Sequence, residues 1–356
     1  MSAADGEVPR PAEYVIVPAR SIDDERLLQF AAAAWHDRPP FRRILASWWR
    51  NAAPECAVAV VHQPSQAMVG LCGGRPCEWV IGGEIYPAVS IGDWYVDPRH
   101  EGRLIGRRIL RHFQVPGRFV NAISISDVAT AYVRRMGWRG PYPSSLMALP
   151  LPRLARIGHW AMRRGSGLDL VEHAVGGGRA LGTLGADLDR IEAARTRGAL
   201  AHMRRGARDW SWRLSIYPER IYRFCVARRD GEPVGYVAVR RMEPGISRQL
   251  GKLQGAMITD LVAVSADRAV LRALGVRAAA IAAEMRAAVA LFVTTAHAQR
   301  HALTAIGFLS PSFPLLGRLL GRRAPVFMWW PGGPGAALAS DGVEMTFADS
   351  TVDLDL

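Results

Sequence analysis

Two stretches of the chain place apolar runs on either side of a short polar turn, as β-hairpins do. In the first half, CAVAVVHQPSQAMVG (56–70) has two such runs around HQPSQ. In the second half, FCVARRDGEPVGYVAV (224–239) repeats the pattern, and its Asp230-Gly231 pair is a strong turn signal. Each hairpin is followed by a strand-like run with an embedded acid, IGDWYV (91–96) and ITDLVAV (258–264). The pattern predicts two sheet-forming regions.

Both regions continue in the same order. A helical segment follows the acid-bearing strand, and then come another apolar strand, another helix and a Gly-aromatic pair. These last three read FVNAISIS and AYVRRMGW in the first half, and ALFVTTA and ALTAIGF in the second. Cys56, Asp93 and Gly137 thus have counterparts in Cys225, Asp260 and Gly307 at nearly constant spacing. Chance similarity among Ala-rich segments is the alternative. We predict an α/β fold (α+β, with mixed sheets) made of two tandem repeats, each a mostly antiparallel mixed sheet flanked by helices.

Composition shifts set the expected domain boundaries. The first repeat ends in the Pro-rich run LMALPLPRLARIG, and a Gly-rich region follows it. We therefore expect an N-terminal domain over 1–155, a linker and helix over 156–208, a C-terminal domain over 209–335 and an acidic tail over 336–356.

Charge and cysteine content narrow the class of protein. The formal net charge is +13, and almost all of the positive charge is arginine, because Lys252 is the single lysine. Such a bias indicates an anionic ligand only where arginines cluster at a plausible site. The four cysteines lack metal-ligand spacing, and the apolar segment 276–296 is interrupted by Arg277, Glu284 and Arg286. We expect a cytoplasmic protein with reduced thiols, no membrane span and no metal.

The junction after the first acid-bearing strand is a candidate anion site. Pro98 ends the strand, Gly102 and Gly106 relieve the turn, and an Arg-rich helix begins within a few residues. Ligands of open α/β sheets collect beyond the carboxyl ends of the strands, and the free N–H groups of a helix start favour phosphate there.

This junction resembles that of the GNAT-type N-acyltransferases, in which V-x-P is followed by Arg/Gln-x-x-Gly-x-Gly/Ala. The corresponding run here is VDPRHEGRLIG (96–106). The resemblance covers roughly 14–150, and 210–330 looks like a diverged copy. It implies that the loop amides hold the pyrophosphate of acetyl-CoA or another acyl-CoA. The cofactor-binding residues would be Val96, Glu101, Gly102, Arg103, Leu104, Ile105, Gly106 and Arg107.

Two positions depart from the family pattern. The Arg/Gln position is Glu101, which Arg99 or Arg103 could pair, and the first loop glycine is Leu104. Neither change removes the helix N-terminus. The second repeat has SADRAVLRALG after Val264, with no glycine before Gly275, so we do not expect acyl-CoA to bind there.

The resemblance also implies the catalytic groups. A strand amide at Val96 would polarise the thioester carbonyl, and Asp93 is the nearest candidate base. Strand alternation puts Asp93 on the opposite face from Val96 unless a bulge intervenes, and a structural acid is an equal alternative. The family's thiolate-protonating Tyr falls on Val133. Tyr132 is one place off, which is ~100° around a helix, and a core role is its alternative.

Three functions remain at this point. The first is acyl transfer from acyl-CoA to an amine of a small molecule or sugar precursor. The second is a catalytically degenerate GNAT-fold binding or scaffold protein. The third is nucleic-acid binding by the basic segments. The Arg-rich composition is a simpler explanation of these segments, so we expect no nucleic-acid partner. The pattern leaves open the acceptor, the acyl length and whether the chain forms a homodimer.

Overall fold

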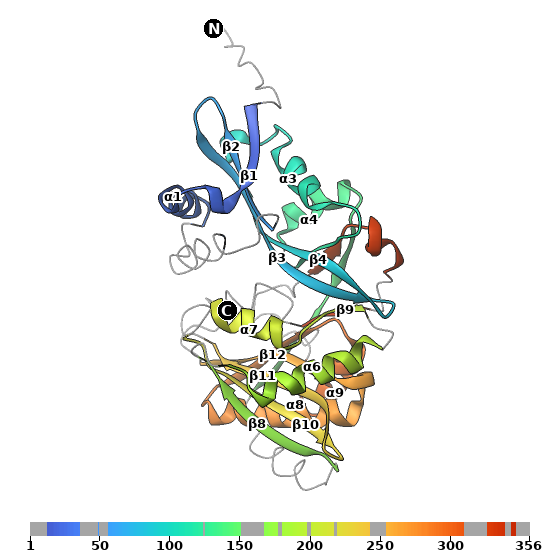
Figure 1. Ribbon diagram of the computed structural model, residues 1–356. Coiled ribbons are helices and arrows are strands. Elements are labelled where there is room, and N and C mark those ends of the chain that lie inside the picture. The colour runs from blue at the N-terminus through green and yellow to red at the C-terminus, as the bar shows by residue number, and fades with distance from the viewer. Residues whose placement is uncertain are drawn as a thin grey trace. The chain divides into compact units, whose positions relative to one another are not determined.

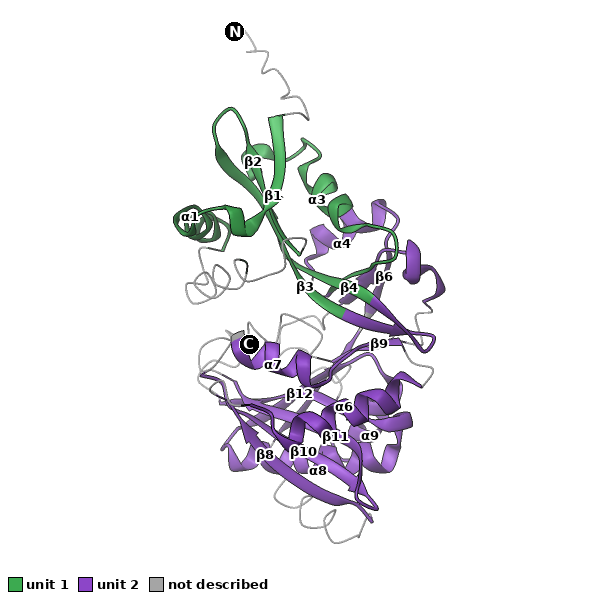
Figure 2. Cartoon of the chain, viewed as in Figure 1, with its two compact units in different colours: residues 1–77, 87–122 green, residues 78–86, 123–356 purple. Residues whose placement is uncertain are grey.

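The computed structural model describes a two-sheet protein (Figure 1). The described residues are 13–35, 49, 56–123, 125–150, 167–176, 180–197, 201–216, 219–242, 254–309, 326–338 and 343–346. Contacts divide the chain into two compact units (Figure 2). Unit 1 is Met1–Cys77 with Pro87–Ala122, and unit 2 is Glu78–Tyr86 with Ile123–Leu356.

Unit 1 contains the first predicted hairpin and the acid-bearing strand that follows it. Its strands run in the order β1-β2-β3-β4-β5, with β1 to β3 joined antiparallel and β4 parallel to β5. Asp23 caps the first helix by accepting a hydrogen bond from the amide of Arg26. The elements are β1 (Tyr14–Pro18), α1 (Asp24–Ala34), β2 (Ala57–His62), β3 (Ala67–Ile81), β4 (Glu84–Val96), α3 (Ile105–Phe113) and β5 (Phe119–Ile123). The hairpin end of β3 and β4, within 78–86, and the last residue of β5 are grouped with unit 2.

Unit 2 contains the second sheet, in the order β7-β13-β12-β11-β10-β8. The predicted Asp230-Gly231 turn joins β10 to β11, and both residues have the positive φ that this hairpin turn requires. The sheet strands are β7 (Ser145–Pro150), β8 (Asp169–Val175), β10 (Tyr222–Arg229), β11 (Glu232–Arg241), β12 (Gly255–Ala263) and β13 (Val289–Thr294). The other elements are α4 (Asp127–Arg135), β6 (Arg139–Pro143), α6 (Thr183–Thr196), β9 (Ala201–Met203), α7 (Ala207–Ile216), α8 (Arg268–Glu284), α9 (His297–Thr304), β14 (Val326–Trp329) and β15 (Val343–Glu344).

Helices cover both faces of the second sheet. Residues of α8 and α9 pack on one face, around Leu274 and Leu303, and residues of α6 and α7 pack on the other, around Leu188 and Trp210. All nine residues of β12 are buried, as expected of a central strand with both faces covered. The predicted α/β fold with two mixed sheets is thus confirmed.

The units do not follow the predicted domain boundaries along the chain. Strand β7, which the sequence assigned to the end of the first domain, pairs antiparallel with β13 in the second sheet. Conversely, β14 from the second repeat pairs with β6 from the first. Part of the expected acidic tail is also built into the fold, because β15 pairs in parallel with β9.

Candidate acyl-CoA site

Strand β4 continues beyond the end of its pairing with β5. The two strands pair from Ala88 to Ile91 and from Phe119 to Ala122, whereas β4 runs on to Val96. Strand β5 itself ends at Ile123, so the last five residues of β4 extend past the pairing at the carboxyl end of the sheet. Such an extension lets a ligand lie along the strand and hydrogen-bond with its backbone.

The loop after β4 turns the chain into α3 through two left-handed residues. Gly102 has φ +77°, and Leu104, immediately before the helix, has φ +60°. Leu104 keeps the turn despite its side chain, which is 58% exposed. No side chain from this N-cap position bonds to the amides of the first turn of α3. The predicted helix start therefore presents N–H groups that suit an anion.

Gly106 has a packing role that the sequence did not reveal. It lies inside the first turn of α3 with negative φ, and the indole of Trp94 occupies the space where its side chain would be. Ile105, its neighbour, is buried, whereas Arg107 is exposed. The glycine thus allows α3 to approach β4 closely, which fixes where the helix begins.

The arginines of the loop pair with other partners than the expected Glu101. Arg99 forms an ion pair with Asp97 at 2.6 Å, and Arg103 donates a hydrogen bond to the Tyr14 hydroxyl. Neither of these pairs includes Glu101, which is exposed and has no ion pair among the described residues. The Arg99 hydrogen bond lowers the pKa of Asp97. Glu101 therefore leaves a negative charge beside the helix start.

A polar cluster anchors the loop to β1 and β2. The Tyr14 hydroxyl lies 3.1 Å from Nδ1 of His100, and the rings of His62 and Tyr14 are 5.1 Å apart. Burial, and then the nearby Arg103 guanidinium, lower the pKa of His100. No sequence signal marked Tyr14, His62 or His100, because the contacts join segments that are far apart along the chain.

Asp93 marks a break in the alternation of β4. Its φ of +49° is left-handed, as in the bulge that the sequence analysis allowed for. The side chains of Val89 and of Phe113 in α3 both lie beside the position that a Cβ on Gly74 would take. Trp94, five residues after Val89, contacts Gly106 of α3 as well. An unbroken strand would turn these two side chains to opposite faces.

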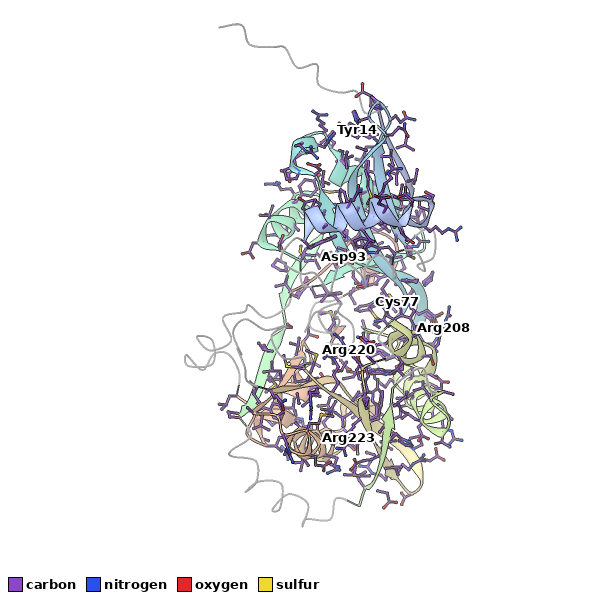
Figure 3. All side chains as sticks on the ribbon, turned by 90° about the vertical axis from the view of Figure 1, so that its left-hand side faces the viewer. Tyr14, Cys77, Asp93, Arg208, Arg220 and Arg223 are labelled. Atoms are coloured by element: carbon purple, nitrogen blue, oxygen red, sulfur yellow. The ribbon has the colours of Figure 1, made fainter. Side chains whose placement is uncertain are left out.

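The Asp93 carboxylate faces an aromatic cluster. Its Oδ2 accepts a hydrogen bond from Nε1 of the fully buried Trp49 at 3.3 Å. The ring of Trp35 lies 5.6 Å from Trp49 and 5.9 Å from Tyr95. Asp93 and Tyr95 thus share one face, as residues two apart in a strand do. In Figure 3, Asp93 lies well apart from Tyr14 within unit 1, so the base candidate and the loop anchor are separate.

Tyr132, the candidate proton donor, belongs to a different compact unit from the β4–α3 junction. Tyr132 lies on α4, which belongs to unit 2, and it is half-buried with the guanidinium of Arg135 6.0 Å from its ring centre. Val133, the position that matches the family's Tyr, is buried. A proton donor for the leaving thiolate therefore stays a prediction.

The corresponding acid of the second repeat has a structural role. Asp260 is fully buried, and it accepts hydrogen bonds from Tyr236 at 2.5 Å, Arg205 at 3.1 Å and Thr346 at 2.8 Å. Half-buried Asp93 and fully buried Asp260 therefore hold equivalent sequence positions in different surroundings.

No helix of the described ranges is long and apolar enough to cross a membrane. The described residues also contain no group of three or more Asp, Glu, His or Cys side chains that could bind a metal ion.

Sequence comparison finds no matching family model and no matching curated protein. Structural comparison does find solved structures of similar fold. A GCN5-related N-acetyltransferase from Anabaena variabilis matches with a TM-score of 0.56 and 13% identity, over 89% of this chain and 72% of that one. A probable N-acyltransferase from Enterococcus faecalis matches with 0.58 and 10%, over 89% and 71%. N-myristoyltransferase of Saccharomyces cerevisiae with bound myristoyl-CoA matches with 0.51 and 10%, over 93% and 86%. At these identities the likeness concerns the fold, and the chain has the fold of the GNAT-type N-acyltransferases.

Proposed function

We propose that the chain is an acyl-CoA-dependent N-acyltransferase whose donor site lies at the β4–α3 junction of unit 1. The observation that carries the proposal is the start of α3, which has no side-chain cap and follows the left-handed Gly102 and Leu104. The diphosphate of acyl-CoA would bind the amides around 102–107. The pantetheine arm would lie along residues 92–96 of β4, beyond the end of its pairing with β5.

The transfer itself requires a base, a polarised carbonyl and a leaving thiol. The acceptor nitrogen would attack the thioester carbon, forming the C–N bond while the C–S bond breaks. A β4 amide at or next to Val96 would stabilise the oxyanion. Asp93 would take the amine proton, directly or through water, and coenzyme A would leave as a thiolate that takes up a proton from water.

The aromatic surroundings of Asp93 favour an amine as acceptor. An amine is cationic before it reacts, and aromatic faces together with a carboxylate attract such a group. Trp35 and Tyr95 are half-buried beside Asp93 and carry faces of this kind. We propose a small-molecule or sugar-precursor amine as the acceptor, with acetyl-CoA as the first donor to test.

Two measurements test the proposal. Equilibrium binding of coenzyme A comes first, followed by release of free thiol from acetyl-CoA and longer acyl-CoAs with a panel of amines. We expect binding and acceptor-dependent thiol release. Binding without release for any donor and acceptor would indicate the scaffold alternative, and absence of binding would refute the donor site.

A matched pair of variants locates the donor site. Leu104→Asp adds a carboxylate at the start of α3, and Leu104→Asn adds a side chain of the same shape without the charge. Both residue types tolerate the left-handed conformation. We expect Leu104→Asp to weaken coenzyme A binding by about tenfold or more, because like charges repel at close range, whereas Leu104→Asn binds nearly as the wild type does. Equal binding by both variants would place the diphosphate elsewhere.

A further inference from the structure

The segment Val343–Thr346 lies buried in unit 2, although the sequence placed it in an acidic tail. Its four residues are at most 6% exposed. The two residues of β15 pair in parallel with Ala201 and His202 of β9. A segment held so closely has a defined place in the fold.

That place is beside the end of β13. The amide of Thr295 donates to the carbonyl of Met345 at 3.2 Å, and the amide of Met345 donates to the Thr295 hydroxyl at 2.9 Å. The same hydroxyl donates to the carbonyl of Val343 at 2.7 Å. An antiparallel bridge between Thr294 and Thr346 completes the contact.

The segment also contacts β12, the parallel neighbour of β13. The Thr346 hydroxyl donates to Asp260 of β12 at 2.8 Å. The Gln299 amide donates both to the carbonyl of Leu261, at 2.6 Å, and to the carboxylate of Glu344, at 3.2 Å. The segment therefore touches both strands at their carboxyl ends.

The parallel pairing of these two strands also stops before the strands end, as it does for β4 and β5. Strands β12 and β13 pair only as far as Met257 and Leu291, although they run on to Ala263 and Thr294. In unit 1, the matching strand end is the one to which we assign the pantetheine arm. In unit 2, residues 343–346 supply hydrogen-bonding groups to the strand ends there.

Ion pairs of Glu344 hold the segment in place. Its carboxylate lies 2.8 Å from Arg195 and 3.4 Å from Arg205, and all three side chains are buried. Burial alone would raise the pKa of Glu344, but the two guanidinium groups hold it below its ordinary value. The segment is thus anchored by a buried anion that shares Arg195 with Glu192 and Arg205 with Asp260.

The helix that follows β12 is also closed to an anion. The carboxylate of Asp267 accepts hydrogen bonds from the amides of Ala269, at 2.8 Å, and Val270, at 3.3 Å, in the first turn of α8. It also pairs with Arg229. By contrast, the N-cap of α3 is Leu104, which offers no such group. A diphosphate would meet a negative charge at α8 and free amides at α3.

A cavity of about 240 Å³ lies next to the segment, with Val343 and Glu344 in its wall. Its remaining wall comes from the β12–α8 connection and from the start of α9. Among the described residues that line the cavity, the acidic one is Glu344, and its carboxylate already pairs with Arg195 and Arg205.

We propose that residues 343–346 are a built-in peptide ligand that closes the acyl-CoA groove of the second repeat, so that each chain binds a single acyl-CoA. The count of one rests on the proposed function of the first repeat. The closure of the second repeat does not, because it follows from contacts within unit 2.

Hydrogen exchange read by mass spectrometry, with and without coenzyme A, tests the closure on the full chain. We expect slow exchange at 343–346, as in core strands. Coenzyme A is expected to slow exchange at 98–107 and to leave 261–270 and 294–299 unchanged. Fast exchange at 343–346, or protection of 261–270 by coenzyme A, would overturn the proposal. Lack of protection at 98–107 alone would instead count against the donor site of the first repeat.

Two variants sharpen the result. Glu344→Gln keeps the side-chain shape but removes one of the two carboxylates that each of Arg195 and Arg205 contacts, leaving Glu192 and Asp260. The buried network then holds two guanidinium groups for two carboxylates in place of three, so we expect exchange at 343–346 to be about tenfold faster or more. Glu232→Gln, at an exposed hairpin position, is the matched control and should leave exchange unchanged. Residual coenzyme A binding by Leu104→Asp, with protection at 261–270, would mean that the second groove is open. If Glu344→Gln does not fold, the exchange pattern of the wild type still decides.

Discussion

The ring of Trp94 occupies the space that a side chain at Gly106 would need. A Cβ placed on Gly106 falls 2.8 Å from Cζ2 of the indole, well inside van der Waals contact. The strand that would carry the acyl donor and the helix that would hold its diphosphate are therefore fitted together at one point. Any enlargement there must shift one element relative to the other.

Gly106→Ala should therefore destabilise the protein even though alanine is the better helix former. Overpacking typically costs about 1–3 kcal/mol, and the gain in helix propensity offsets up to about 1 kcal/mol. We expect a net loss of about 1 kcal/mol in the free energy of unfolding and at least about threefold weaker coenzyme A binding. Urea denaturation measures the first. In a Trp94→Phe background the penalty should shrink, and an unchanged penalty in that double-mutant cycle would show that the ring is not its cause.

Leu104 occupies a conformation that suits glycine, and Leu104→Gly should stabilise the protein. The left-handed conformation costs a non-glycine residue about 1–2 kcal/mol, whereas glycine loses about 0.5–1 kcal/mol more backbone entropy on folding. Because the leucine side chain is 58% exposed, little packing is lost. We expect a gain of up to about 1 kcal/mol in the free energy of unfolding. Leu104→Ala is the control and should change little, and a destabilised Leu104→Gly would mean that the leucine packs usefully.

The sequence predicted those parts of the fold that depend on local pattern. Both hairpins, the Asp230-Gly231 turn and the helix start after Pro98 follow from neighbouring residues. The pairing of β7 with β13 could not be read in the same way, because strand order is set by long-range packing. The Tyr14–His100 contact and the burial of 343–346 likewise join distant segments that carry no periodic signal. The sequence pattern placed Gly106 in the turn. Its packing role could not be predicted, because the contact with Trp94 forms only when β4 and α3 pack together.

Glu101 should weaken the binding of the anionic donor. It is exposed beside the helix start, and its charge contributes to the raised pKa of Tyr95, after burial and Asp97. Removing one surface charge at about 6–8 Å is worth roughly 0.5–1 kcal/mol. Glu101→Gln should therefore lower the Kd for coenzyme A about two- to fivefold, measured by calorimetry in low salt.

Ionic strength supplies the check on this electrostatic cause. The difference between Glu101→Gln and wild type should shrink at 0.5 M salt, where the Debye length is only about 4 Å. Glu25→Gln, at an exposed position on α1, should not change the affinity. A salt-independent improvement would point to a change in loop structure rather than in charge.

Asp93→Asn tests the proposed base. A positioned general base typically contributes about 10²–10⁴-fold to the rate, so we expect kcat to fall about 10²-fold or more while the KM for acyl-CoA stays within about twofold. Asp24→Asn, exposed on α1, is the control. Trp49→Phe removes the hydrogen bond to Asp93 and should lower kcat less than Asp93→Asn does. An active Asp93→Asn enzyme would reassign Asp93 to a structural role.

His100 should make the protein less stable in mild acid. The Tyr14 hydroxyl has one proton, and because it accepts a hydrogen bond from Arg103 it can donate that proton to Nδ1 of a neutral His100. Burial and the Arg103 charge lower the pKa of His100 in the folded state, so the unfolded chain takes up a proton first as the pH falls below about 6.5. Stability is then lost between that pH and the lower folded pKa.

His100→Gln removes this proton uptake while keeping a polar side chain. We expect a smaller loss of stability between pH 7 and pH 5, with a change in slope of at most about 1.4 kcal/mol per pH unit, the value for one proton. Urea midpoints across this range measure it. Some acid sensitivity should persist, because burial, followed by the charge of Arg118, lowers the pKa of His112 in the same direction. An identical slope in wild type and His100→Gln would show that His100 takes up its proton equally in both states, which the contact with Tyr14 and Arg103 argues against.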